Sequence, residues 1–179
     1  MFNLSKRIWK LPTSIKINNT PLEFVKEIRY LGYMFTSSNN DDLHISSLYR
    51  GLCIRSNMIL RNFSKCTKDV KSLLFKSFCT SFYCLALVFK HRISDMNKLR
   101  VCYNNSFRRL FNLSRQTSVS AQFVQHGIPT FMETLRKAVV SLLRRLRESK
   151  NRLLSGLVDS NYFHSTIIFS QWKKIAYVA

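Results

Sequence analysis

An uncharged apolar stretch in the middle of the chain limits what the chain can fold into. Residues 77–89 carry no charge, and apolar character begins at Leu73, within a helix that we expect to run from Thr67 to about His91. A helix that is apolar on nearly every side is buried by the elements around it. The stretch is too short to cross a bilayer, which needs about 20 apolar residues. The segment therefore predicts a soluble protein, nuclear or cytoplasmic, without stable membrane insertion.

The charge balance narrows the choice of partner. The 179 residues include 29 Lys and Arg against 9 Asp and Glu, a net charge of +20, while 46% of the residues are hydrophobic. That composition supports a folded domain with a field that attracts polyanions. Nucleic acid (RNA, DNA or an RNA–DNA hybrid) is the first expectation. Two alternatives stay open: a basic helical protein-interaction module that meets an acidic partner, and a peripheral protein on anionic membrane.

Hydrophobic periodicity predicts an α+β fold. Alternating residues over 14–36, around the turn signal Asn18-Asn19-Thr20-Pro21, predict an N-terminal β-hairpin. A polar linker over 37–42 follows, and Asp41 and Asp42 within it are suited to capping the next helix. Helical patterns follow over 43–64, from Thr67, from Ser94, over 119–126 and from Thr130 to about residue 151. The hairpin therefore precedes a mainly α-helical bundle of four or five helices.

The residue types that catalysis requires are not arranged for it. Metal-dependent nucleotidyl transfer needs two or three converging carboxylates, and the only adjacent pair, Asp41-Asp42, lies in the polar linker. The four His are isolated, and the five Cys have irregular spacing that is typical of reduced thiols. We expect no catalytic residue, no metal site and no cofactor.

Cations and tyrosines are the candidate binding residues. Lys and Arg neutralise phosphates, and exposed aromatic rings stack on unpaired bases. The stacking candidates are Tyr30, Tyr33 and Tyr103. The phosphate-binding candidates lie on the third predicted helix and its exit and on the fifth: Arg100, Arg108, Arg109, Arg115, Arg136, Lys137, Arg144, Arg145 and Arg147.

An ordered series of segments over residues 14–158 resembles the C-terminal part of a non-LTR retrotransposon reverse transcriptase of the jockey or chicken-repeat type. The segment IKINNTPLEFVKEIRYLGYMF is similar to the strand pair of the primer grip, with Tyr30, Leu31 and Gly32 at its Tyr-Leu-Gly. NDDLHI and FSKCTKDVKSLLFKSFCTSFYC resemble the start of the thumb, and RLRESKNRLLSGL resembles its closing helix. The most specific segment is LRVCYNNSFRRLFNLSRQTSVSAQFV.

This resemblance implies a division of the chain and a role. Residues 1–36 would be a palm-end segment with the primer-grip hairpin, 37–158 a helical thumb-like domain, and 159–179 a tail of uncertain order. A complete enzyme of the family copies RNA into DNA with Mg²⁺ held by palm Asp residues, and this chain has no such palm. The resemblance therefore implies a fragment that is no enzyme, needs no cofactor, and grips the template–primer through its phosphates with little sequence preference.

Overall fold

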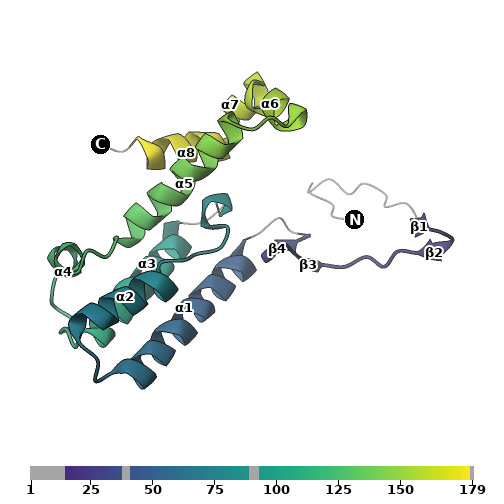
Figure 1. Cartoon of the computed structure of the whole chain (residues 1–179). Coiled ribbons are helices and arrows are strands. Elements are labelled where there is room, and N and C mark those ends of the chain that lie inside the picture. The colour runs from purple at the N-terminus through teal and green to yellow at the C-terminus, as the bar shows by residue number, and fades with distance from the viewer. Residues whose placement is uncertain (1–14, 38–40, 89–92, 178–179) are drawn as a thin grey trace.

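The computed structural model describes residues 15–37, 41–88 and 93–177, which form two small β-hairpins followed by eight α-helices (Figure 1). This arrangement confirms the expected α+β fold, in which strands precede a helical bundle. Five of the helices occupy segments predicted to be helical. Three more follow residue 151, so the described part of the chain has more helices than the four or five expected.

The first hairpin is short. β1 (Lys16–Ile17) pairs antiparallel with β2 (Thr20–Pro21) across Asn18 and Asn19, whose φ angles are 49° and 64°. Asparagine tolerates this left-handed conformation, which two-residue hairpin turns require. Pro21 lies opposite Lys16, and beyond it the Leu22 N–H still donates to the Ile15 carbonyl at 2.7 Å. The chain then leaves the pairing before β3, so the single hairpin predicted over 14–36 is instead two hairpins.

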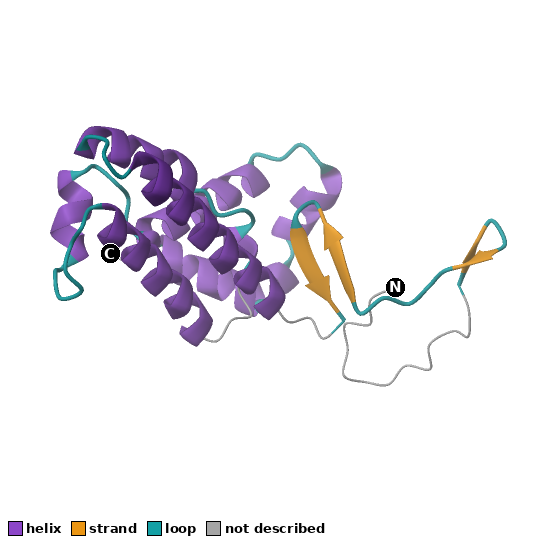
Figure 2. Cartoon of the chain, turned by 90° about the horizontal axis from the view of Figure 1, so that it is seen from below, coloured by secondary structure: helices purple, strands orange, loops and turns teal. Residues whose placement is uncertain are grey.

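The second hairpin lies next to the helices. β3 (Glu27–Tyr30) pairs antiparallel with β4 (Tyr33–Thr36) across Leu31 and Gly32, whose φ angles are 46° and 82°. Figure 2 shows this pair beside the helical bundle, whereas the first hairpin stands away from it at the end of an extended segment. Only β4 has a buried residue, Tyr33, so the hairpin touches the bundle through one strand.

Three helices make the first layer of the bundle. α1 (Asp42–Phe63), α2 (Lys68–Cys79) and α3 (Ile93–Leu110) lie side by side (Figure 1). Asp42 and Asp95, in the first turns of α1 and α3, line one hollow, so the two helices begin at the same end and run in the same direction. The short connection from α1 makes α2 run antiparallel to both.

The start of α1 differs from expectation in one respect. Asp41 occupies the N-cap position, but its side chain makes no capping hydrogen bond and accepts one from the hydroxyl of Tyr33 instead. The prediction that the Asp41 side chain caps this helix is therefore wrong. Asp42 lies in the first turn, where a carboxylate meets the positive end of the helix dipole. Asp41 thus links β4 to α1.

The apolar stretch is only partly buried, and most of it is not helical. Cys79, Leu85, Ala86 and Val88 are buried, whereas Phe78, Tyr83 and Leu87 are exposed, so the expectation that this segment is buried on nearly every side is wrong. α2 ends at Cys79, where the Thr80 hydroxyl donates to the Lys76 carbonyl at 2.6 Å. The chain then turns through Cys84, with φ of 53°, into the 3-10 helix η1 (Leu85–Leu87). The prediction of one helix to His91 is wrong within the described residues, and His91 itself lies outside them. The buried carbonyl of Ala86, in this segment, accepts a hydrogen bond from the indole of Trp172 in the C-terminal tail. This bond satisfies the carbonyl without a helical partner.

The next two helices begin and end where local signals place them. α4 (Val119–Gln125) is followed by Gly127, whose φ of 56° ends it. α5 (Phe131–Arg147) starts in a capping box: Glu133 N–H donates to the Thr130 hydroxyl at 3.2 Å, and Thr130 N–H donates to the Glu133 carboxylate at 2.6 Å. The helix stops at Arg147, a turn earlier than its polar continuation predicts.

The tail folds into helices and returns to the bundle. α6 (Arg152–Val158), α7 (Asn161–Ser165) and α8 (Ile167–Ala176) follow α5, and α8 packs against α5 (Figure 1). Phe169 and Trp172 of α8 are buried. The segment 159–177, whose order was not predicted, therefore contributes Phe163, Phe169 and Trp172 to the hydrophobic core.

Aromatic rings fill the centre of the bundle. Tyr103, Phe107 and Phe123 meet Phe75 of α2 and Phe131 of α5, and all five are buried. The centroids of Phe75 and Tyr103 are 5.2 Å apart, and those of Phe107 and Phe123 are 4.4 Å apart. Large buried rings at these separations tie α2, α3, α4 and α5 into one unit.

Candidate nucleic-acid interface

A row of cations runs along the outer face of α5. Arg136, Arg144 and Arg147 are exposed, and their spacing places them on one flank of the helix, beside the buried stripe that includes Leu135 and Val139. From the first to the last of these arginines the helix rises about 17 Å. A duplex carries one negative charge per about 1.7 Å of its axis. The row is therefore long enough to meet several phosphates at once.

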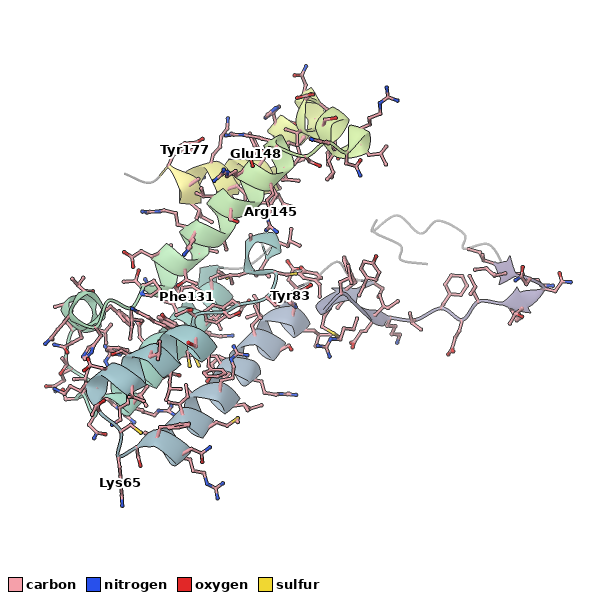
Figure 3. The ribbon with its side chains drawn as sticks, viewed as in Figure 1. Lys65, Tyr83, Phe131, Arg145, Glu148 and Tyr177 are labelled. Atoms are coloured by element: carbon pink, nitrogen blue, oxygen red, sulfur yellow. The ribbon has the colours of Figure 1, made fainter. Side chains whose placement is uncertain are left out.

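The end of α8 lies beside this row. The Nε–H of Arg136 donates to the Ile175 carbonyl at 3.2 Å. Further along, Arg144, Arg147 and Tyr177 line a hollow of about 590 Å³. Tyr177 is 66% exposed, and Figure 3 shows it close to the end of α5 near Glu148. An aromatic ring therefore stands at the edge of the cations.

Internal hydrogen bonds fix the arginines without using their terminal nitrogens. Arg136, Arg144 and Arg145 donate through Nε, to the Ile175 carbonyl, the Glu148 carboxylate at 2.8 Å and the Ser141 carbonyl at 3.3 Å. A guanidinium has four further N–H donors on its terminal nitrogens. Those donors remain available to a phosphate, whose oxygens accept the paired N–H groups of arginine. The Arg144–Glu148 pair is solvent-exposed on both sides, so an incoming phosphate competes with it at small cost.

Two cations of α8 directly precede the residue that contacts Arg136, and sequence reasoning did not select them. Lys173 and Lys174 are exposed in the last turn of α8, the turn that contacts Arg136. The Lys173 ammonium also lies 4.9 Å from the Phe169 ring centroid. The apolar spacing of residues 167–176 was the signal for an amphipathic helix that would display these lysines. The α5–α8 strip, as defined here, consists of Arg136, Lys137, Arg144, Arg147, Lys173, Lys174 and Tyr177.

The remaining candidates on α5 divide between this strip and its flank. Lys137 is exposed and lies next to Arg144 around the helix, so it extends the strip. Arg145 projects on the other side of the buried stripe, where its Nε donates back to Ser141. Arg145 therefore faces away from Arg136 and Arg147, at about 180° and 160° around the helix.

The structure distributes the α3 candidates over different surfaces. Arg100 and Arg109 are nine residues apart, which places them about 180° from each other around the helix. Arg100 lines a hollow of about 240 Å³ beside the start of α5, and Arg109 lies on the side of Tyr49 in α1, where its charge acts on the tyrosine. Arg115 is exposed in the loop before α4. These cations form no strip of their own.

Arg108 has a structural position. Its Nε and Nη2 both donate to the Thr117 carbonyl, at 3.4 and 3.2 Å, and its Nη1 donates to the Asn105 side chain at 3.1 Å. It was expected to face outward, but it is partly buried and ties the loop after α3 back onto that helix. All three of its nitrogens are engaged, so Arg108 is a poor phosphate ligand.

Two of the three stacking candidates are buried. Tyr103 has no exposed surface, and its hydroxyl donates to the Pro129 carbonyl at 2.7 Å. Tyr33 is 9% exposed and packs on His44 with the ring centroids 4.3 Å apart. The prediction that these rings are free to stack on bases is wrong, because both are packing residues. Tyr30 is exposed at the tip of β3.

The hairpin tip borders an apolar hollow. Tyr30, Leu31 and Phe35, together with Tyr83 and Ile168, line a space of about 410 Å³ between the second hairpin, the segment before η1, and α8. Tyr30 and Leu31 are strongly exposed. This surface has few polar groups, so it has neither the charge nor the donors of the α5–α8 strip. The primer-grip candidates Tyr30, Leu31 and Gly32 are thus on a separate, apolar surface.

Neither of two other site types is found in the described residues. Across 15–37, 41–88 and 93–177, no three His, Cys, Asp or Glu side chains gather closely enough to hold a metal ion. Over the same residues, no helix combines the length and the apolar character that crossing a membrane requires. The chain matches no protein-family model, no curated protein and no solved structure.

Proposed function

We propose that the chain is a non-catalytic nucleic-acid-binding module whose α5–α8 strip grips the phosphate backbone of RNA, DNA or an RNA–DNA hybrid without sequence preference. The observation that carries this proposal is the row of exposed Arg136, Arg144 and Arg147, in which the internal bonds of Arg136 and Arg144 leave their terminal donors free. Contacts of this kind go to phosphate and carry no base information. The net charge of +20 adds long-range attraction.

The resemblance found in the sequence gives this module a context. We propose that it corresponds to the primer-grip and thumb part of a non-LTR retrotransposon reverse transcriptase, without the catalytic palm, acting in the nucleus or cytoplasm. In that setting the strip would hold the template–primer, while the polymerase chemistry and its Mg²⁺ would belong to a palm. An RNA–DNA hybrid is therefore the first ligand to test.

Burial of the apolar stripe of α5 disfavours the membrane alternative. An interfacial helix inserts its apolar face into the lipid boundary. In α5 that face includes Leu135, Val139 and Leu143, all buried in the bundle. Lipid insertion would require α5 to leave the core, whereas phosphate binding uses the face that is already outside.

A salt titration of binding tests the proposal. Fluorescence anisotropy with a labelled RNA–DNA hybrid should give log affinity that falls linearly with log salt concentration, because each phosphate contact releases counterions. The double variant R144Q/R147Q should bind more weakly, with a slope reduced by about 1 for each lost contact. The matched control is R61Q/K65Q, which removes two exposed cations near the turn between α1 and α2. Figure 3 shows Lys65 at the end of the molecule far from Tyr177.

The outcomes separate the alternatives. Equal losses in both double variants would mean that total charge, and not the strip, determines binding, and would refute the assignment of the interface. No binding to any nucleic acid at low salt would refute the function itself. Anionic vesicles that float the protein, in the absence of nucleic-acid binding, would favour the peripheral membrane role instead.

A further inference from the structure

Two cysteine thiols meet across the contact between α1 and α3. The Sγ atoms of Cys53 and Cys102 are 3.4 Å apart, and both thiols are free. Cys102 is buried, whereas Cys53 is only partly buried. The two helices pack along their lengths in the same direction, so neither thiol needs a change of fold to reach the other.

The distance to be closed is small. Sulfur atoms in a disulfide lie about 2.05 Å apart, so the pair must approach by about 1.4 Å from its present contact. Small rotations about the two Cα–Cβ bonds shorten the separation, and the helix backbones can stay in place. Cys66, in the turn after α1, and Cys79, buried in α2, are on other parts of the bundle.

One member of the pair is reachable from solvent. Cys53 lines a hollow of about 760 Å³ between α1 and α3, whose rim includes Arg50 and Lys98. Asp42 and Asp95 line the same hollow, so accessibility and not charge distinguishes Cys53 from Cys102. The thiolate is the form of a cysteine that attacks a disulfide. Burial raises the pKa of Cys102 to about 12, with a further contribution from Cys53, which makes Cys102 the second and not the first thiol to react.

We propose that Cys53 and Cys102 form a redox-responsive pair that closes to a disulfide between α1 and α3 in the presence of a low-molecular-weight disulfide such as oxidised glutathione. In the first step Cys53 loses its proton to solvent and attacks the reagent; a sulfur–sulfur bond forms, the reagent's own bond breaks, and one thiolate leaves. In the second step Cys102 loses its proton and attacks the Cys53 sulfur, expelling the second thiolate. Two protein thiols are oxidised, and one reagent disulfide is reduced to two thiols.

The cross-link has a measurable consequence for stability. It encloses the second half of α1, all of α2 and the first half of α3 in one covalent loop. A disulfide that closes a loop of this length restricts the unfolded chain and should raise the thermal midpoint by about 5–10 °C. The pair is remote from the α5–α8 strip in sequence and in packing, so this inference does not depend on the proposed function.

The experiment treats the full chain with oxidised glutathione, blocks remaining thiols, and maps the peptides by mass spectrometry. The expected result is a cross-linked peptide pair containing Cys53 and Cys102, lighter by two hydrogen atoms than its reduced form, and a thermal midpoint that returns to its initial value after reduction. The C102S variant should stop after the first step and retain a glutathione adduct on Cys53. The C66S variant should form the same cross-link as the wild type.

Each other outcome overturns the proposal. A stable glutathione adduct on Cys53 in the wild type, a different pairing, or a chain with no oxidation at Cys53 would show that the two thiols do not act together. If C102S fails to fold, peptide mapping of the wild type and of C66S still decides the question.

Discussion

The indole N–H of Trp172 donates to the carbonyl oxygen of Ala86 at 2.9 Å, in the interior of the protein. Ala86 lies in η1, where the apolar stretch has left the helical path, and Trp172 lies in the last helix, α8. The bond supplies a buried carbonyl with a partner that no helical ladder provides. The irregular segment and the C-terminal tail therefore stabilise each other.

Replacement of Trp172 by Phe should measure how much this hydrogen bond contributes to the free energy of unfolding. Phe keeps most of the apolar ring but has no donor, so the Ala86 carbonyl is left buried without its indole partner. We expect a loss of about 1–3 kcal/mol in the free energy of unfolding, measured by urea denaturation. Tyr162, which is 78% exposed, is the control, and Y162F should change stability by less than about 0.5 kcal/mol. A W172F protein as stable as the wild type would show that the bond contributes nothing.

The capping box of α5 predicts a second difference in stability. Thr130→Ala removes the hydroxyl that accepts from the Glu133 N–H, and we expect a cost of about 1 kcal/mol. Ser118 occupies the equivalent position before α4 but makes no side-chain capping bond. S118A is therefore the matched control and should cost clearly less. Equal losses from T130A and S118A, in the same denaturation experiment, would contradict the assigned role of the box.

Two glycines predict opposite responses to alanine. Gly32 has a φ of 82°, and an added Cβ would lie 2.8 Å from Cε1 of Tyr83, so G32A should destabilise the contact of the second hairpin with the bundle. Gly156 lies within α6 with no atom within 4 Å of its added Cβ. G156A should stabilise by about 0.5–1 kcal/mol. Urea denaturation would measure both changes. A stabilising G32A would mean that the close approach is not present in solution.

Local signals predicted the features that depend on neighbouring residues. The turn at Asn18 and Asn19 and the start of α5 after Thr130 each need only a few residues of sequence. The position of Tyr103 also follows from local spacing, because Leu99 and Phe107 lie four residues away on either side and all three are buried. The helical periodicity of these residues predicts a buried Tyr103, in contrast to its assignment as a stacking residue.

The features that were not predicted from the sequence depend on contacts between residues far apart in the chain. The segment after Cys79 leaves the helical path, and the buried Ala86 carbonyl within it is bonded by Trp172, in a tail whose fold was not predicted. The α5–α8 strip also depends on the fold of the C-terminal tail. Its arginines on α5 were identified from the sequence, but Tyr177 lies beside them only because α8 returns to the bundle.

A histidine at the junction of α2, α3 and α4 predicts a pH dependence of stability. The Nδ1 atom of His126 lies 3.1 Å from the hydroxyl oxygen of Ser72, and its ring packs 4.3 Å from the ring of Phe111. Burial lowers the pKa of His126 below its usual value of 6.5, and the positive charge of Lys68 acts in the same direction, while Asp69 opposes it. Protonation is thus harder in the folded chain than in the unfolded chain.

The sign of the effect follows from this order of pKa values. The unfolded chain takes up the proton first as the pH falls, so the free energy of unfolding should decrease from about pH 6.5 downward until the folded chain is protonated as well. Urea denaturation at about pH 7.5, 6.5 and 5.5 should show this loss in the wild type and a smaller one in H126Q. The control H164Q alters an exposed histidine and keeps His126, so it should follow the wild type. An H126Q protein with an unchanged pH dependence would assign the loss to other groups, because a side chain that cannot be protonated has no part in the linkage.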